Sequence, residues 1–470
     1  MKLARIAVFA CTVATVAGPA TAAAPRTLQE ALAEAYSNNP QLQAARAQLR
    51  ATDEGVPQAQ AGWRPTVIVA AGAGYSQGTF RTRSQASAFS PGGENTIPND
   101  RDLFNGSATV TQPLFRGGQT TAATHQATNA VYAQRARLLG TEQQVFLDTI
   151  NAFVGVIQAR QLNALNINNE QVLARQLQAT NDRFRVGEIT RTDVAQAEAA
   201  LAGARAQRQT SEGNVQTAYA TYLRQVGEAP QQLAEPQPLH LPVKAENEAA
   251  QLASANNPAV IASLFDNAAA KDNVDVAFSQ LMPQLSLQAQ ALRQDNSTIA
   301  GSRVIAAQVL LNASVPIYQG GAEYSRIRQA RQQQQQQQRL VDDARRQAIQ
   351  AATQSWQTLV AARTTIESTR AQIRANEVAL EGTQREAIVG SRTTLDVLNA
   401  EQALLNSRVT LVQNLTNLIT ASYSVAASIG RLTARDLTLN VPFYDDTAYS
   451  RAVRGRVWGT GDYATTQPGR

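Results

Sequence analysis

The chain has 470 residues, of which 43% are hydrophobic, 17% charged and 5% aromatic, and its formal net charge is +6. Basic residues alternate with Asp, Glu and many Gln, a distribution that argues against nucleic-acid binding. Scarce aromatic residues beside abundant Ala and Gln suit long, closely packed helices better than the core of a globular enzyme.

Residues 1–22 have the form of a secretory signal peptide, with Lys2 and Arg5 before an apolar segment and small residues at its end. The only cysteine, Cys11, lies inside this segment, so we expect a mature chain without thiols, disulfides or Cys-bound metal. Cys11 is a poor lipoprotein site, because the preceding apolar run is short and Phe9 is bulky. No later apolar run is long enough for a transmembrane helix.

The remaining chain is predicted to contain two copies of one unit, at residues 23–229 and 246–430, joined by a Pro-rich linker at 230–245. Gly187 and Asp193 match Gly390 and Asp396 at a constant offset of 203 positions. The first copy carries an insertion, which we place as a loop in the polar run 77–102. Residues 431–470 lose periodicity and are expected to form a mobile, partly disordered basic tail.

Each copy is predicted to consist of a shorter helix, two strands, a long helix and a shorter return helix. A capping-box pattern at Thr27–Glu30 opens the first helix, and Asn39-Pro40 interrupts it. The expected helices run over 27–62, 118–184, 192–226, 246–280, 322–387 and 394–429. The lengths favour two shorter helices stacked end to end beside each long one.

The return helix 394–429 carries two apolar stripes, one through Leu395 and Leu398 and the other through Val397 and Leu404. Two stripes fit a helix with neighbours on both sides, as in a closed cylinder of helices, whereas a two-stranded coiled coil needs one. A buried helix of an ordinary bundle is the alternative. The glutamine run 332–338 is interpreted as a solvated helical face, in preference to a disordered segment.

Four segments, about 64–76, 106–113, 282–293 and 303–316, are predicted to be strands. Ile305, Val309 and Leu311 alternate with Gln308 and Asn312, which suits a barrel that faces lipid outside and water inside. A soluble β-hairpin is the alternative. Four strands do not close a barrel, and sheet edges do not face lipid, so the membrane interpretation requires oligomers. A dimer gives eight strands with a filled interior, whereas a trimer gives twelve and leaves a lumen.

Each long helix is followed by a Gly-centred turn, at 186–194 in the first copy and at 389–397 in the second. Gly accepts the positive φ that ends one helix, and the following Thr and Asp can cap the next. An ordinary connection between two helices is the alternative for either turn alone.

Taken with the segment Ser314–Gly321 and the Asn-Pro pairs at 39–40 and 257–258, these two turns resemble the TolC family of outer-membrane efflux and type I secretion channels. The resemblance covers all but the last 40 or so residues of the expected mature chain. It implies a homotrimeric 12-strand β-barrel, with four strands per chain, on a long α-helical coiled-coil tunnel. It further implies a location in outer-membrane lipid that extends into the periplasm, and docking to a periplasmic adaptor (membrane fusion) protein and an inner-membrane transporter.

The same resemblance implies roles for residues near the turns. In the closed state Thr192 and Asp193 resemble the acceptors of a latch between hairpins, and Arg392 resembles its basic partner. Asp396 matches the first of two acidic positions at a constriction, but Asn399 stands at the second, and Ala387 replaces a latch Tyr of some members. The residues expected to dock the adaptor are Val186, Gly187, Glu188, Ile189, Thr190, Val389, Gly390 and Ser391.

No catalytic or cofactor motif is recognised. His125 and His240 lack the spacing of metal ligands and are interpreted as surface residues, and no Gly-rich phosphate loop follows a strand. The sequence therefore predicts a passive exit duct whose energy comes from a partner. The alternative is a secreted or periplasmic coiled-coil structural or adhesive protein, which the alternating strands and the doubled turns disfavour.

Overall fold

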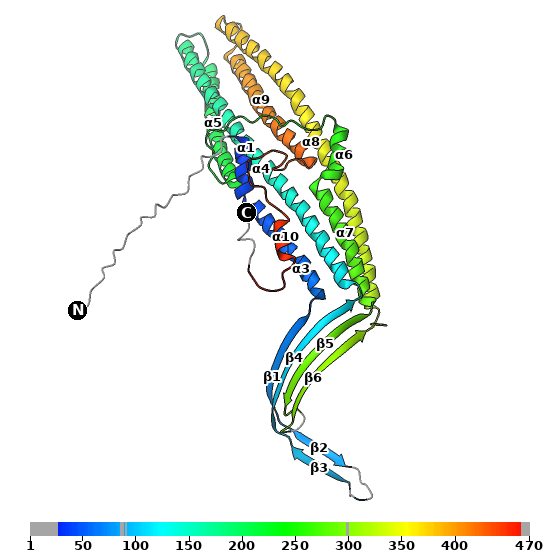
Figure 1. Ribbon diagram of the computed structural model, residues 1–470. Coiled ribbons are helices and arrows are strands. Elements are labelled where there is room, and N and C mark those ends of the chain that lie inside the picture. Colours follow the sequence, from blue (N-terminus) through cyan, green and yellow to red (C-terminus); the bar gives the residue numbers. More distant parts are fainter. Residues whose placement is uncertain (1–26, 85–88, 90–91, 298–299, 462–470) are drawn as a thin grey trace, which may run out of the picture. The chain divides into compact units, whose positions relative to one another are not determined.

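The computed structural model describes residues 27–84, 89, 92–297 and 300–461 (Figure 1). The predicted signal peptide at 1–22, with Cys11, lies outside the described residues. The helices are α1 (Leu28–Asn38), α2 (Pro40–Asp53), α3 (Gly55–Gln60), α4 (Gln119–Arg185), α5 (Arg191–Val226), α6 (Glu246–Asn256), α7 (Pro258–Phe278), α8 (Ala322–Ile388), α9 (Thr394–Ser428) and α10 (Ala448–Val453). The strands are β1 (Thr66–Ser76), β2 (Thr79–Ser84), β3 (Gly93–Pro98), β4 (Arg101–Arg116), β5 (Gln284–Asp295) and β6 (Arg303–Ser314).

Local capping explains where the shorter helices begin. Before α1, the Glu30 amide donates to Thr27 Oγ1 at 3.2 Å and the Thr27 amide donates to Glu30 Oε2 at 3.3 Å, which forms the expected capping box. Asn39 caps α2 and Pro40 is its first residue. Asn257 does the same for α7, so the single helix expected over 246–280 is divided into α6 and α7.

Four strands form one antiparallel sheet in the order β1-β4-β5-β6, which makes β1 and β6 its edges. The strand β4 is longer than the predicted 106–113, because its polar start pairs with the end of β1, where Arg101 lies opposite Ser76. The register with β5 shifts between Pro113 and Phe115. A bulge accommodates Pro113, since proline has no amide to donate to a regular ladder.

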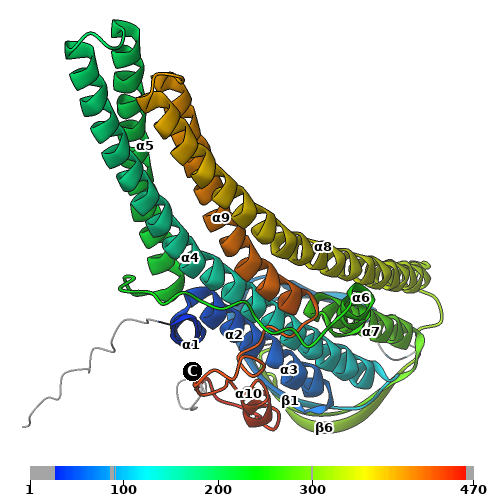
Figure 2. The ribbon, with the colours of Figure 1, turned by 90° about the horizontal axis from the view of Figure 1, so that it is seen from above.

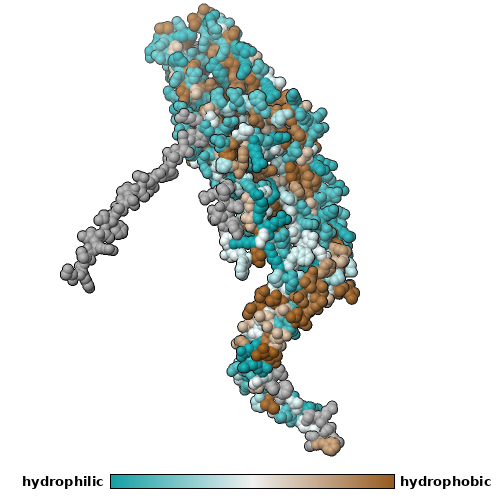
Figure 3. Space-filling view, in the orientation of Figure 1, coloured by the Kyte–Doolittle hydropathy of each residue, from teal (hydrophilic) through white to brown (hydrophobic). Residues whose placement is uncertain are grey.

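The register gives this sheet one apolar and one mostly polar face. Strand alternation places a row of apolar residues side by side on one face, namely Val67, Val110, Ala289 and Val309. The adjacent row on the other face contains Gln290 and Gln308, whose side-chain amides are hydrogen bonded at 2.9 Å. Hydrophobic side chains gather over the sheet in Figure 3, and Val309 is 67% exposed. The predicted alternation is therefore confirmed. The apolar face of the sheet is exposed in the described single chain.

The polar run expected to be a loop contains a hairpin. Strands β2 and β3 pair antiparallel from Thr79 opposite Pro98 to Ser84 opposite Gly93. The ion pair between Arg81 and Glu94, at 3.4 Å, crosses this hairpin. Cross-strand hydrogen bonding and charge pairing thus organise a segment that has little apolar periodicity.

The chain folds as two compact units. Among the described residues, the first contains 27–35, 149–237 and 373–412, and the second contains those within 36–148, 238–372 and 413–461. In the first unit α5 lies beside α4, with the rings of Phe153 and Tyr222 at 6.2 Å (Figures 1 and 2). In the second unit α2 and α3 lie along the start of α4, and α6, α8 and α9 share a core around Leu359, Val425 and Ile429. Across the described residues, the helices contain no segment with the length and apolar character needed to cross a membrane.

The described part of the C-terminal tail is packed within the second unit, in contrast to the mobile tail expected from 431 onward. Arg46 is buried and lies between the rings of Tyr36 and Tyr444, at 4.6 and 5.0 Å from their centroids. The buried carboxylate of Glu142 accepts a 2.7 Å hydrogen bond from the Ala434 amide. Aromatic stacking on a buried guanidinium and a backbone bond to a buried acid do not depend on helical periodicity, so the sequence pattern gave no sign of them.

Candidate functional site

The two turns at the ends of the helical hairpins have the same backbone geometry. Gly187 and Gly390 each have φ +81°, in the left-handed region that favours glycine. The Glu188 amide donates to Arg183 O and the Ser391 amide donates to Glu386 O, both at 3.0 Å. Bonds of this span from beyond a left-handed glycine to the last helical turn define a Schellman motif. Both long helices therefore stop by the same local mechanism, as predicted.

A capping box then starts each return helix. Thr190 and Asp193 exchange hydrogen bonds at the start of α5, and Thr393 and Asp396 do so before α9. Hydrogen bonds from Thr190 hold the pKa of Asp193 below its ordinary value, and those from Thr393 do the same for Asp396. Each aspartate is thus an ionised group at a helix N-terminus, where the helix dipole favours negative charge.

Apolar side chains protrude at both turns. Val186, Ile388 and Val389 are 72%, 79% and 78% exposed. Among the predicted docking residues only Ile189 is half-buried, and the others are exposed. Ile388 was missed by sequence reasoning, although its position directly before the predicted set was a usable signal. Exposed aliphatic residues on a rigid turn are a feature of interaction surfaces.

The structure gives the predicted latch residues other partners within the chain. Arg392 Nε lies 2.9 Å from Glu386 Oε2 in its own turn, and Asp193 is bonded to Thr190. These contacts lie within one chain, whereas the pairing of Arg392 with Thr192 or Asp193 is expected between hairpins of the closed state, so that pairing stays a prediction. Glu386 lies across a tight turn from Arg392, where an exposed arginine reaches it at little entropic cost.

A second arginine, Arg183, connects the two hairpins and was not predicted. Its Nε lies 3.0 Å from Glu188 Oε2 in its own turn, and its Nη2 approaches Ala387 O of the other hairpin at 3.5 Å. Ala387 is buried at this contact, whereas Asn399 is exposed. Below the turns Leu398 packs against buried Leu173 and its neighbours, which holds the hairpins together.

Comparison with known proteins places this geometry in a family. A family model described as "Outer membrane efflux protein" matches residues 31–228 and 249–431. The outer membrane efflux protein BepC of Brucella suis biovar 1 is 35% identical over 442 residues, covering 93% of this chain and 92% of BepC. The outer membrane protein TolC of Escherichia coli (strain K12) is 24% identical, covering 87% of this chain and 83% of TolC.

Solved structures show the same fold. The crystal structure of the outer membrane protein VceC from Vibrio cholerae matches with a TM-score of 0.71 at 21% identity, covering 86% of this chain and 96% of VceC. The family model spans most of the chain, and the similarity to BepC extends over nearly the full length of both proteins. The chain therefore belongs to the outer membrane efflux protein family.

Proposed function

We propose that three copies of this chain form an outer-membrane exit duct of a tripartite efflux pump or type I secretion system. The duct conducts substrates passively through a twelve-strand barrel and a helical periplasmic tunnel. A periplasmic adaptor and an inner-membrane transporter supply the energy and the substrate.

The observation that carries this proposal is the sheet β1-β4-β5-β6. Within the part of the chain that the structure describes, its two edge strands are unpaired on their outer sides, and one of its faces is apolar and exposed. An open edge in lipid leaves amide and carbonyl groups without partners, each at a cost of several kcal/mol. Pairing β6 of one copy with β1 of the next removes every edge, and three copies of four strands give a barrel wide enough for a lumen. A soluble coiled-coil structural protein leaves the apolar face unexplained.

The two turns are the proposed adaptor contacts. They present exposed Val186, Ile388 and Val389 beside glycines, which carry no side chain and therefore let a partner come close to the backbone. Three chains would present six such turns. Asp396, ionised and half-buried at the start of α9, is proposed to form an acidic ring with its two symmetry mates.

Replacing Gly187 and Gly390 together with Trp tests the docking part. We expect export to be lost while trimers remain in the outer membrane, because bulky side chains block the turns and strain the backbone by about 1–2 kcal/mol at each site. Gly213→Trp, at an exposed site in the middle of α5, is the matched control and should export normally. Normal export by the double variant would refute the docking role.

The duct itself is tested separately. Purified protein reconstituted in planar bilayers should give stable ion conductance without a nucleotide or an ion gradient as energy source. Absence of conductance in correctly assembled protein would contradict the duct, whatever the outcome for docking.

A further inference from the structure

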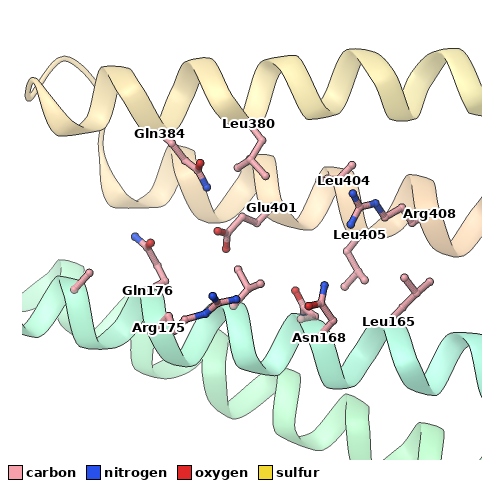
Figure 4. A pocket seen from close by; sticks show the side chains of 13 residues that line it. Leu165, Asn168, Arg175, Gln176, Leu380, Gln384, Glu401, Leu404, Leu405 and Arg408 are labelled. Atoms are coloured by element: carbon pink, nitrogen blue, oxygen red, sulfur yellow. The ribbon is translucent and has the colours of Figure 1, made fainter.

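A cavity of about 520 Å³ lies between the two hairpins of the first unit, lined by residues of α4, α8 and α9 (Figure 4). Its walls include the apolar side chains of Leu165, Val172 and Leu405. Cavities of roughly 300–1,000 Å³ with mostly apolar walls and a few placed polar groups are typical of small-molecule sites. The cavity is therefore of a size that suits a small organic ligand, and its walls also carry the polar side chains of Asn168, Asn169, Gln176 and Gln384.

The polar group that distinguishes this cavity is the carboxylate of Glu401. The residue is only 7% exposed, and its Oε2 has no hydrogen-bond partner among the described residues. Figure 4 shows the side chain reaching from α9 into the space between α9 and α4. Burial raises the pKa of Glu401, and a hydrogen bond donated by Gln384 only partly opposes this rise. A buried carboxylate with an open acceptor is costly unless a donor or a cation satisfies it.

Among the residues that the structure describes, the other charged groups at the cavity do not form an ion pair with Glu401. Arg408 is paired with Glu377, 2.8 Å away. Arg175 is exposed, and its Nε donates to Gln171 O of its own helix at 3.4 Å. Water screens an exposed guanidinium strongly, whereas a buried charge is screened much less. The dominant unmatched charge inside the cavity is therefore negative.

We propose that this cavity binds a small organic cation with an apolar body, with the ammonium group on Glu401 and the hydrocarbon against Leu165, Val172 and Leu405. The cation supplies the missing donor to Oε2 and neutralises the buried charge. The apolar body displaces water from the aliphatic walls, which is favourable in proportion to the area covered. A ligand at this place contacts α4 and α9 together and thereby links the two hairpins.

The repeat offers a matched control at Glu198. This glutamate stands at the position in α5 that corresponds to Glu401 in α9, at the same offset of 203 residues, but it is exposed. Removing the Glu198 carboxylate therefore measures the general effect of losing an acidic group from this part of a return helix. Removing the Glu401 carboxylate measures, in addition, the effect of losing it from the cavity.

The test uses phenethylammonium as the probe and the purified, full-length chain in detergent, with binding measured by isothermal titration calorimetry at pH 8. We expect Glu401→Gln to weaken binding at least tenfold, and Glu198→Gln to leave it unchanged. Neutral phenethyl alcohol should bind at least tenfold more weakly than the ammonium. Removing the rim charge with Arg175→Ala should tighten binding of the cation, because a repulsive group is lost.

Two further measurements keep the outcome decisive. Binding should weaken as the pH falls through the raised pKa of Glu401, because protonation removes the charge that the cation recognises. Leu405→Trp fills the cavity without touching the carboxylate and should also abolish binding. Equal affinity for the alcohol, equal affinity in Glu401→Gln, retained affinity in Leu405→Trp, or no binding at millimolar probe would each overturn the proposal. None of these readouts depends on export or on conductance.

Discussion

Asp53 is the residue whose charge costs the fold most clearly. It is 1% exposed in α2, and neither of its carboxylate oxygens has a hydrogen-bond partner among the described residues. Burial is the largest influence and raises its pKa to about 6, while the nearby Arg135 pulls it down. Arg135 also forms an ion pair with Asp446 of the tail, in which Arg135 Nε lies 3.6 Å from Asp446 Oδ2. This second pair limits how far Arg135 stabilises the charge of Asp53.

We predict that Asp53→Asn stabilises the protein at pH 8 and that this gain shrinks on acidification. The native pKa of about 6 lies above the ordinary value of 3.8, so the ionised form is the one that folding disfavours. The cost is full above pH 6, on the order of 2–3 kcal/mol, and is lost as the pH falls from 6 toward 4. Thermal unfolding midpoints at pH 8 and pH 5 measure the difference.

The control for this prediction is Asp343→Asn, at an exposed site on α8, which should give the same small change at both pH values. If Asp53→Asn unfolds at a lower temperature than the unsubstituted protein at pH 8, the attraction between Asp53 and Arg135 outweighs the cost of burying the carboxylate.

The two turns are the elements on which the predicted latch between hairpins depends. The contact between Arg392 and Glu386 is exposed, so water screens it and it contributes little to stability. A pair this weak can exchange partners. We propose that in the closed trimer Arg392 leaves Glu386 for the start of a neighbouring α5, at Thr192 and Asp193, and that three such contacts together bias closure.

We predict that Arg392→Ser raises single-channel conductance in planar bilayers, whereas Glu386→Gln does not raise it. Both variants lose the pair within the turn, but only the first loses the arginine that would hold the neighbour. Arg385→Ser removes an exposed arginine paired with Glu381 in the same helix and is the control. In the same bilayers, Asp396→Asn should weaken block by divalent cations, because it removes the carboxylates of the proposed acidic ring.

An equal rise in conductance for Arg392→Ser and Glu386→Gln would show that the pair only stiffens its own turn. Unchanged block in Asp396→Asn would move the constriction to another position.

At the scale of the whole molecule, the edges of the sheet are proposed to determine assembly. A single cysteine on β1 at Ala70, combined with single cysteines scanned along β6 from Val304 to Leu311, should yield covalent trimers for some pairs on oxidation. The reason is that β1 and β6 of neighbouring copies are expected to pair, and paired strands bring Cβ atoms within disulfide range. The only natural cysteine, Cys11, lies in the predicted signal peptide, so the background is low.

Non-reducing gels of outer membranes measure this outcome. The control places the second cysteine on β5 at Ala289, inside the sheet, where no neighbouring copy is expected to reach. Monomers throughout the scan, or dimers as the largest species, would contradict the twelve-strand barrel.

Local patterns in the sequence determined the elements and the turns. Gly187 and Gly390 end the long helices, and Thr190 and Thr393 start the return helices through contacts within a few residues, so the pattern alone was sufficient. Alternation fixed the apolar face of the sheet for the same reason, since the side-chain period of a strand is local. These features do not depend on what packs against them.

Tertiary structure decided the features that involve distant partners. Glu198 and Glu401 occupy matching places in the repeat, yet one is exposed and the other buried, because only α9 has its glutamate covered by another hairpin. The tail was expected to be mobile because it lacks periodicity, but Tyr444 packs on Arg46, some 400 residues away in the chain. Burial and ion pairing depend on which parts of the chain pack together in the fold. A periodic pattern in the sequence reports only on local secondary structure.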